Sequence, residues 1–192
     1  MEPDFGTYHH STPDESRKMR EKAGKVFSSL FLSLYPADAE LRILDAGCGL
    51  GFMSSIAAGC FHNSRITAVD IFQHDSLSDA SLERAEANME ILGIGSRVEI
   101  LQHDLINPLP FGADFDLAIS SLVFHNLGKR RFEGYQTVFS ALKSGGYFII
   151  GDLFPSLKKD MDFFSRFSSA VREEGEEGSG EWSYRILGMK KK

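Results

Sequence analysis

The chain has 192 residues, 42% of them hydrophobic, which is enough for one good core and too little for two full domains with a linker. Lysine and arginine total 21 against 27 acidic residues, and the net charge of −6 argues against a broad surface for nucleic acid. Cys48 and Cys60 form no metal-ligand spacing, and neither a signal peptide nor a membrane-spanning run is present in the sequence. We therefore expect one soluble, cytoplasmic domain over residues 1–192 without a metal.

A helix is expected to begin directly after an irregular N-terminal arm. Thr12 suits the N-cap position, Pro13 the first helical position, and Glu15 the reciprocal place in a capping box. The residue before a proline is pushed out of helical geometry, so Pro36 ends the helix near Leu34. Residues 1–36 are thus predicted to form an arm and a helix.

Short apolar runs then alternate with longer amphipathic stretches, a pattern typical of parallel strands joined by helices. The predicted strands cover residues 42–46, 65–70, 97–102, 116–121 and 147–152. Apolar residues at helical spacing precede Gly93 and Gly145, which suit helix ends. The order predicts an α/β fold with a core over residues 42–153.

The C-terminal part, residues 154–192, is predicted to contain a helix, a loop and a last strand. Apolar residues at helical spacing favour a helix over 156–174, and a stretch rich in glycine and glutamate to Glu181 favours a loop. Residues 182–189 suit a strand. We expect five parallel strands and one or two antiparallel ones.

The most informative segment is the apolar strand that runs into Gly47, Gly49 and Gly51. Glycines allow a tight turn and close approach of the backbone to a ligand, and a following helix offers free N–H groups. A dinucleotide fingerprint would require another glycine where Phe52 stands, which disfavours a nicotinamide-dependent oxidoreductase. A purely structural turn is the alternative interpretation.

Asp45-x-Gly47-x-Gly49-x-Gly51 resembles motif I of the class I S-adenosylmethionine-dependent methyltransferases. The resemblance implies a Rossmann-like, three-layer α/β/α sandwich whose mostly parallel sheet carries an antiparallel C-terminal strand. It also implies S-adenosyl-L-methionine as cofactor, with S-adenosyl-L-homocysteine as product. The cofactor-binding residues in this motif would be Asp45, Gly47, Cys48, Gly49 and Gly51.

Two further strand ends match the same family. Asp70, followed by Ile71, stands where the family has an acid for the ribose hydroxyls and an apolar residue against adenine. Asp104 and Leu105 resemble the position that receives the adenine amino group. A carboxylate suits vicinal hydroxyls because it only accepts hydrogen bonds. Solvated acids at strand ends are the alternative.

The segment around the fourth strand resembles small-molecule methyltransferases, in which Ser followed by an apolar pair and a His is common. Ser120 is predicted to contact the cofactor there. His125 is the candidate catalytic residue, because an imidazole can orient or deprotonate an acceptor near neutral pH. The alternative for His125 is a purely structural loop residue.

The expected methyl acceptor is a small molecule. An RNA or protein substrate, guided by Lys129, Arg130 and Arg131, is a second hypothesis, and a catalytically silent cofactor-binding module is a third. Residues 73–79 are expected to form a pocket wall, and residues before Pro36, 124–129 and 163–185 to form the lid. Aromatic side chains are expected to line the acceptor space, namely Phe124, Phe163, Phe164 and Phe167.

Overall fold

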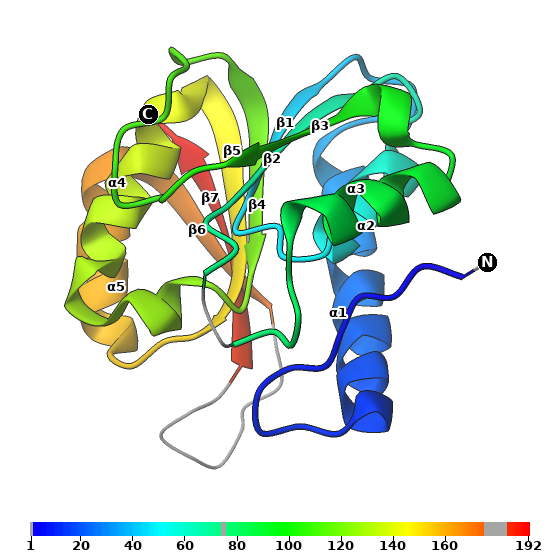
Figure 1. Ribbon diagram of the computed structural model, residues 1–192. Helices are drawn as coiled ribbons and strands as arrows, with labels where there is room; N and C mark the ends of the chain where they lie inside the picture. Colours follow the sequence, from blue (N-terminus) through cyan, green and yellow to red (C-terminus); the bar gives the residue numbers. More distant parts are fainter. Residues whose placement is uncertain (1, 74–75, 175–183) are drawn as a thin grey trace.

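A seven-stranded sheet with the order β3-β2-β1-β4-β5-β7-β6 forms the centre of the computed structural model (Figure 1). The model describes residues 2–73, 76–174 and 184–192. The strands are β1 (Arg42–Ala46), β2 (Arg65–Asp70), β3 (Val98–Gln102), β4 (Phe115–Ser121), β5 (Leu142–Leu153), β6 (Ser168–Glu174) and β7 (Tyr184–Lys191). β1 to β5 pair in parallel, whereas β7 runs antiparallel to its neighbours β5 and β6.

Within the described residues, five α-helices and two 3₁₀-helices accompany the sheet. The elements are α1 (Pro13–Leu34), α2 (Phe52–Cys60), α3 (Leu82–Ile91), a 3₁₀-helix (Gly95–Arg97), a second one (Phe124–Arg130), α4 (Arg131–Ala141) and α5 (Leu157–Phe167). α1, α2 and α3 cover one face of the sheet, and α4 and α5 cover the other (Figure 1). This arrangement confirms the three-layer α/β/α fold. No helix in the described ranges is both long and apolar enough to span a membrane.

The central strand β1 shows why both faces are covered. Its side chains alternate between the faces, with Ile43 in the core on the α1 and α2 side and Leu44 and Ala46 in the core on the α4 and α5 side. All three side chains are fully buried. A strand that is apolar on both faces requires helices on both sides.

α1 begins and ends as its sequence predicts. The Glu15 backbone N–H donates to the Thr12 hydroxyl oxygen at 3.3 Å, and the Glu15 carboxylate accepts the Thr12 N–H at 2.8 Å. The capping box therefore satisfies donors that the first helical turn leaves free. The helix ends at Leu34, with Tyr35 already extended before Pro36.

The helix predicted over 156–174 is wrong in its second half. α5 ends at Phe167, and residues Ser168–Glu174 form β6, which pairs with β7. At the helix end the Ser168 hydroxyl donates to the Phe164 carbonyl at 2.8 Å. Pairing with a strand distant in sequence outweighs local helical spacing here. The loop predicted to Glu181 and the start of the predicted last strand lie outside the described residues.

Candidate functional site

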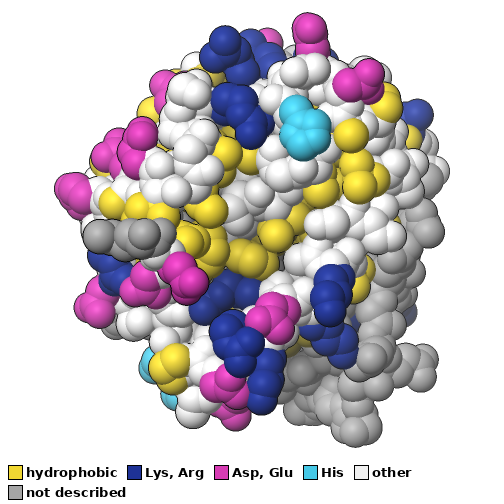
Figure 2. All heavy atoms as spheres, turned by 90° about the vertical axis from the view of Figure 1, so that its right-hand side faces the viewer, with side chains coloured by type: hydrophobic (Ala, Val, Ile, Leu, Met, Phe, Trp, Pro, Cys, Tyr) yellow, Lys and Arg dark blue, Asp and Glu magenta, His cyan; other side chains and the backbone are white. Residues whose placement is uncertain are grey.

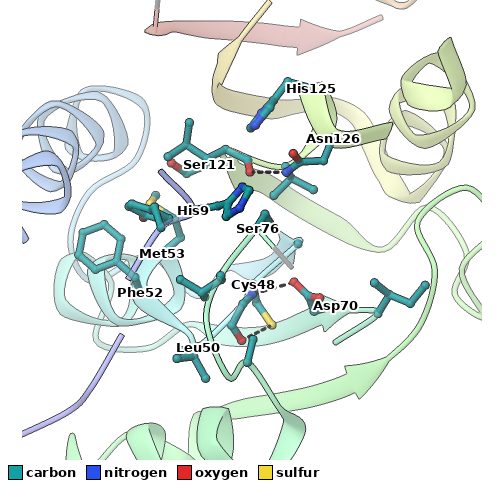
Figure 3. A pocket seen from close by; sticks show the side chains of 18 of the residues that line it. His9, Cys48, Leu50, Phe52, Met53, Asp70, Ser76, Ser121, His125 and Asn126 are labelled. Carbon is teal, nitrogen blue, oxygen red and sulfur yellow. Dashed lines mark hydrogen bonds between the residues drawn. The ribbon is translucent and has the colours of Figure 1, made fainter. Parts of the chain in front are cut away.

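A cavity of about 700 Å³ opens at the carboxyl ends of the parallel strands. Its walls come mainly from five segments, namely the glycine loop after β1, the loop after β2, the loop after β3, the turn after β4 and the N-terminal arm. Figure 3 shows Asp70 and Cys48 toward one end of this cavity and His125 and Asn126 toward the other. Ligands of open α/β sheets bind at this edge, because strand-end loops meet there.

The glycine loop leaves no room for larger residues. Gly47, Gly49 and Gly51 have φ angles of 80°, 51° and 87°, a region that favours glycine. A Cβ at Gly47 would collide with Val123, and one at Gly49 would lie 2.9 Å from the Leu77 side chain. Gly47 and Gly49 therefore bring bare backbone to the cavity wall, whereas Gly51 caps α2 behind it.

Asp70 ties this loop to the end of β2. One carboxylate oxygen accepts the Gly49 N–H and the other accepts the Phe72 N–H, both at 2.8 Å. A carboxylate offers about four acceptor sites. Asp70 lines the cavity and therefore has capacity left for two ligand donors.

The end of β3 brings the second predicted pair beside the first. The His103 N–H donates to the Asp70 carbonyl at 2.9 Å, so the loops after β2 and β3 lie side by side. Asp104 accepts the Ile106 N–H at 3.1 Å. Asp104, Leu105 and Ile71 all line the cavity.

Two other predicted residues lie beneath the loop and do not line the cavity. Asp45 is fully buried, accepts the Ser54 hydroxyl at 2.6 Å, and has a second carboxylate oxygen without a partner among the described residues. Burial, together with the charge of Asp70, raises the pKa of Asp45 to about 7. The Ser120 hydroxyl donates to the Ala46 carbonyl at 2.7 Å. Through these hydrogen bonds, both residues stabilise the end of β1.

Cys48 lines the cavity between the glycines, and its Sγ lies 3.6 Å from the Gly49 carbonyl. Burial raises the pKa of its thiol well above the ordinary value, and the nearby acids Asp45 and Asp70 add to this rise. The group therefore stays a neutral thiol at physiological pH. A neutral buried thiol is a poor nucleophile, so small size explains this residue better than reactivity.

His125 lies at the far end of the cavity and has a partner that the sequence did not indicate. Its Nδ1 lies 2.5 Å from a carboxylate oxygen of Asp152, which is almost fully buried at the end of β5. β4 and β5 pair in parallel with Ser121 opposite Gly151, so the residues that follow both strands meet. The only sequence signal was that His125 follows the strand predicted over 116–121 and that Asp152 ends the strand predicted over 147–152.

The N-terminal arm also belongs to the site, through residues that the sequence analysis did not single out. Tyr8 pairs with Leu77 in an isolated antiparallel bridge, and the His9 N–H donates to the Ser76 carbonyl at 2.9 Å. All four residues line the cavity. In Figure 3, His9 lies between the ends marked by Asp70 and His125. The predicted roles of the arm and of residues 73–79 in enclosing the site are supported, while residues 74–75 lie outside the described ranges.

The predicted aromatic lining is wrong. Phe124, Phe163, Phe164 and Phe167 pack in the core beneath α4 and α5, where Phe164 lies 4.7 Å from the Tyr135 ring centre. Among the described residues of the 163–185 region none lines the cavity, and residues 175–183 of the lid predicted there lie outside the described ranges. Helical spacing cannot distinguish a core face from a pocket face. Among the described residues, the Phe and Tyr side chains that line the cavity are Phe5, Tyr8, Phe52 and Phe72.

A family model described as a methyltransferase domain matches residues 37–187. The chain belongs to this methyltransferase family. A solved structure of a geranyl diphosphate methyltransferase in complex with S-adenosylmethionine has the same fold, with a TM-score of 0.70 at 12% identity over 99% of this chain and 98% of that one. S-adenosylmethionine is the cofactor of the family.

Two curated relatives differ in their substrates. A 24-methylenesterol C-methyltransferase from Oryza sativa subsp. japonica is 29% identical over 76% of this methyltransferase chain and 38% of its own length. An rRNA N(6)-adenosine-methyltransferase from Caenorhabditis elegans is 32% identical over 41% of this chain and 35% of its own length. The chain thus spans less than half of either relative.

The cavity fits the family's cofactor on its own geometry. The glycine loop is a cradle that a Cβ would fill, and Asp70 offers free acceptor capacity beside it. Leu122 and Phe72, with φ angles of 59° and 53°, bring two more strained backbone positions to the cavity wall. Such strain persists where the surrounding structure holds it, often at functional sites.

Proposed function

We propose that this chain transfers a methyl group from S-adenosylmethionine to a compact small molecule. When bound, the cofactor supplies an activated methyl group on a sulfonium. In this proposal Gly47, Cys48 and Gly49 face the cofactor, Asp70 accepts its ribose hydroxyls, and Asp104 accepts the adenine amino group. Ile71 and Leu105 pack against the adenine. Asp45, Gly51 and Ser120 hold the glycine loop in place from below.

The enclosure of the cavity favours a small acceptor. A volume of about 700 Å³ has to hold the cofactor and the acceptor together, and the arm and the loop after β2 meet across it. Ligand pockets of this kind combine apolar walls with a few placed polar groups. Phe5, Tyr8, Phe52 and Phe72 supply apolar area, while His125 and Asn126 supply polar groups at the acceptor end.

Two of the three basic residues that would guide RNA, at positions 129–131, form ion pairs within the protein. Arg131 is buried and donates to the Asp160 carboxylate at 2.6 Å, and Arg130 pairs with Glu133 at 2.9 Å. Only Lys129 of the three remains an exposed cation without such a pair in the described part of the chain. On the face that carries α1, basic and acidic side chains are interspersed around a hydrophobic centre (Figure 2). These observations favour the small-molecule substrate over RNA.

Calorimetric titration of the purified chain tests the cofactor part of the proposal. S-adenosylmethionine and S-adenosylhomocysteine should bind with one site, and nicotinamide adenine dinucleotide should not. Release of S-adenosylhomocysteine from mixtures of small-molecule acceptors tests the transfer. Methylation of a structured RNA with no turnover of small acceptors would favour the alternative.

A further inference from the structure

His125 is held in one orientation by a buried carboxylate. One Asp152 oxygen accepts the Phe124 N–H at 2.7 Å, and the other lies 2.7 Å from the Leu153 N–H and 2.5 Å from His125 Nδ1. The two backbone groups are donors, so they favour Asp152 as an ionised, acceptor-only group. Asp152 is 1% exposed, so this arrangement is shielded from solvent.

This contact decides where the imidazole carries its proton. A neutral imidazole has one N–H and one lone pair, and a carboxylate accepts only from an N–H. The proton therefore sits on Nδ1, and Nε2 keeps the lone pair. Among the described residues, Nε2 has no hydrogen-bond partner, and His125 lines the cavity at the end away from Asp70 (Figure 3).

Several other ionisable groups of the described residues lie around the pair. Burial raises the pKa of Tyr135 on α4 and of Tyr184 on β7, so both stay neutral phenols at physiological pH. The Arg131 and Asp160 charges neutralise each other between α4 and α5. Arg185 stands opposite Asp152 in the β5–β7 register, and His9 approaches from the arm.

We infer that His125 Nε2 is the base that accepts the proton of an acceptor hydroxyl, and that Asp152 is the residue that positions it. The inference rests on the proposed methyl transfer and narrows the acceptor to an alcohol or phenol. The acceptor oxygen bonds to the methyl carbon as the bond between that carbon and the sulfonium sulfur breaks. The electron pair of the broken bond stays on sulfur, and the hydroxyl proton moves to Nε2.

We infer a hydroxyl acceptor because a general base assists a hydroxyl more than it assists an amine or a thiol. A neutral amine already offers a lone pair, and a thiol with an ordinary pKa of about 8.5 ionises readily, whereas a phenol near 10 or an alcohol above it does not at neutral pH. Base assistance of this kind contributes about 10²–10⁴ in rate. A buried Asp–His pair aimed at an acceptor is most useful for the least acidic of these nucleophiles.

The first test measures the tautomer of His125. Nitrogen NMR of the chain with ¹⁵N-labelled histidine and bound S-adenosylhomocysteine, assigned with His125→Gln, should show a protonated Nδ1 and an unprotonated Nε2 above neutral pH. A protonated Nε2 in the native chain would overturn the inference. Absence of S-adenosylhomocysteine binding would instead contradict the proposed function.

The second test measures transfer to matched compounds that carry a hydroxyl, thiol or amino group on the same aromatic ring. We expect turnover of the hydroxyl compound, and a decrease in kcat of about 100-fold in Asp152→Asn. S-adenosylmethionine affinity should stay unchanged in this variant, and the exposed Asp162→Asn should behave as the native chain. Turnover confined to amines or thiols, or an unchanged kcat in Asp152→Asn, would overturn the inference. A protonated Nε2 would overturn the inference even if no compound of the set reacts.

Discussion

The Asp70 carboxylate orders the glycine loop and also faces the cavity, so we propose two functions for it. The first is visible in its hydrogen bonds to Gly49 and Phe72. The second follows from its remaining acceptor sites and belongs to the proposed ribose contact. A substitution here should therefore affect cofactor affinity more than folding.

We expect Asp70→Ala to stay folded and to bind S-adenosylhomocysteine at least about tenfold more weakly, since a hydrogen bond to a charged group contributes about 1.5–3 kcal/mol. Calorimetry gives the dissociation constant, and circular dichroism checks the fold. Asp162→Ala, a change of the same kind at an exposed residue outside the cavity wall, is the matched control. An unchanged dissociation constant for Asp70→Ala would contradict the ribose role.

Asp45 couples the stability of the loop to pH. Its pKa of about 7 in the folded chain lies above that of an unfolded aspartate, so the folded state holds its proton longer. The free energy of unfolding therefore falls as pH rises from about 4 to about 7 and levels off above that range. Below about pH 4 this contribution is fully present, because both states are then protonated.

Asp45→Asn should abolish most of this dependence, because asparagine does not ionise. Urea unfolding at about pH 5 and about pH 8, without cofactor, should show the native chain losing on the order of 1–3 kcal/mol relative to the variant. Parallel pH dependence of the two proteins would contradict this account of Asp45.

The sequence predicted the location of some site residues correctly, missed another and misplaced a third. The positions of Gly47, Gly49, Asp70 and Asp104 at the cavity could be predicted because strand-end residues of parallel strands gather at one edge, whereas their roles stay predictions. Asp152 was not, because its contact with His125 depends on the β4–β5 register and on side-chain direction. Phe164 was misassigned because apolar spacing looks the same toward a core and toward a pocket.

The N-terminal arm forms part of the cavity wall, and Arg20 of α1 holds it in place. The Arg20 guanidinium donates to the Gly6 carbonyl at 2.7 Å and to the Phe5 carbonyl at 3.3 Å, and it lies 5.0 Å from the centre of the Tyr8 ring. Asn88 on α3 adds hydrogen bonds to both the N–H and the carbonyl of Asp4. Cofactor exchange should then depend on release of this arm.

Arg20→Met keeps the apolar stem and removes the guanidinium, so S-adenosylhomocysteine should dissociate several-fold faster. Stopped-flow displacement measures that rate. Arg17→Met is the control, because Arg17 is exposed and pairs only within α1, with Asp14 and Glu21. Equal dissociation rates in the native chain and Arg20→Met would show that the arm does not limit exchange.

A buried ion pair fixes α5 against α4. Arg131 and Asp160 are 7% and 0% exposed and lie 2.6 Å apart. Removing one partner of such a pair leaves a buried charge, which costs about 3–5 kcal/mol. Asp160→Ala should lower the free energy of urea unfolding by that amount, whereas Glu133→Ala, which disrupts the exposed pair with Arg130, should change it by less than about 1 kcal/mol. Similar losses in both variants would contradict this distinction.

Prediction of the elements was most accurate where local signals agree. The bounds of β1 and β2 match because each is a short apolar run between turn residues. β6 was missed because Ser168 and the residues after it continue a helical pattern, while the residues that pair with them lie after residue 183. Pairing between distant segments leaves no local signal in either segment.

At the scale of the whole molecule, the net charge and the mixed surface bear on the choice of substrate. The chain carries −6, and two of the three clustered cations at residues 129–131 are paired within the fold. Nucleic-acid affinity comes largely from cations that neutralise phosphates. We therefore expect this chain to have little electrostatic attraction to RNA.

We expect no measurable binding of a fluorescent RNA hairpin at low salt, and no change in that result for Lys129→Ala. Fluorescence anisotropy at rising salt concentration measures it. Binding that weakens steeply with salt and is lost in Lys129→Ala would favour the macromolecular substrate.

The hydrogen bond between His125 and Asp152 joins the turn after one parallel strand to the end of the next. It forms only when Ser121 lies opposite Gly151, and a shift of one residue would turn Asp152 to the other face of the sheet. Parallel pairing of this kind closes a long loop and is slow to form during folding. The ring N–H signal of His125 therefore gives a refolding experiment a marker for the moment when the centre of the sheet reaches its native alignment.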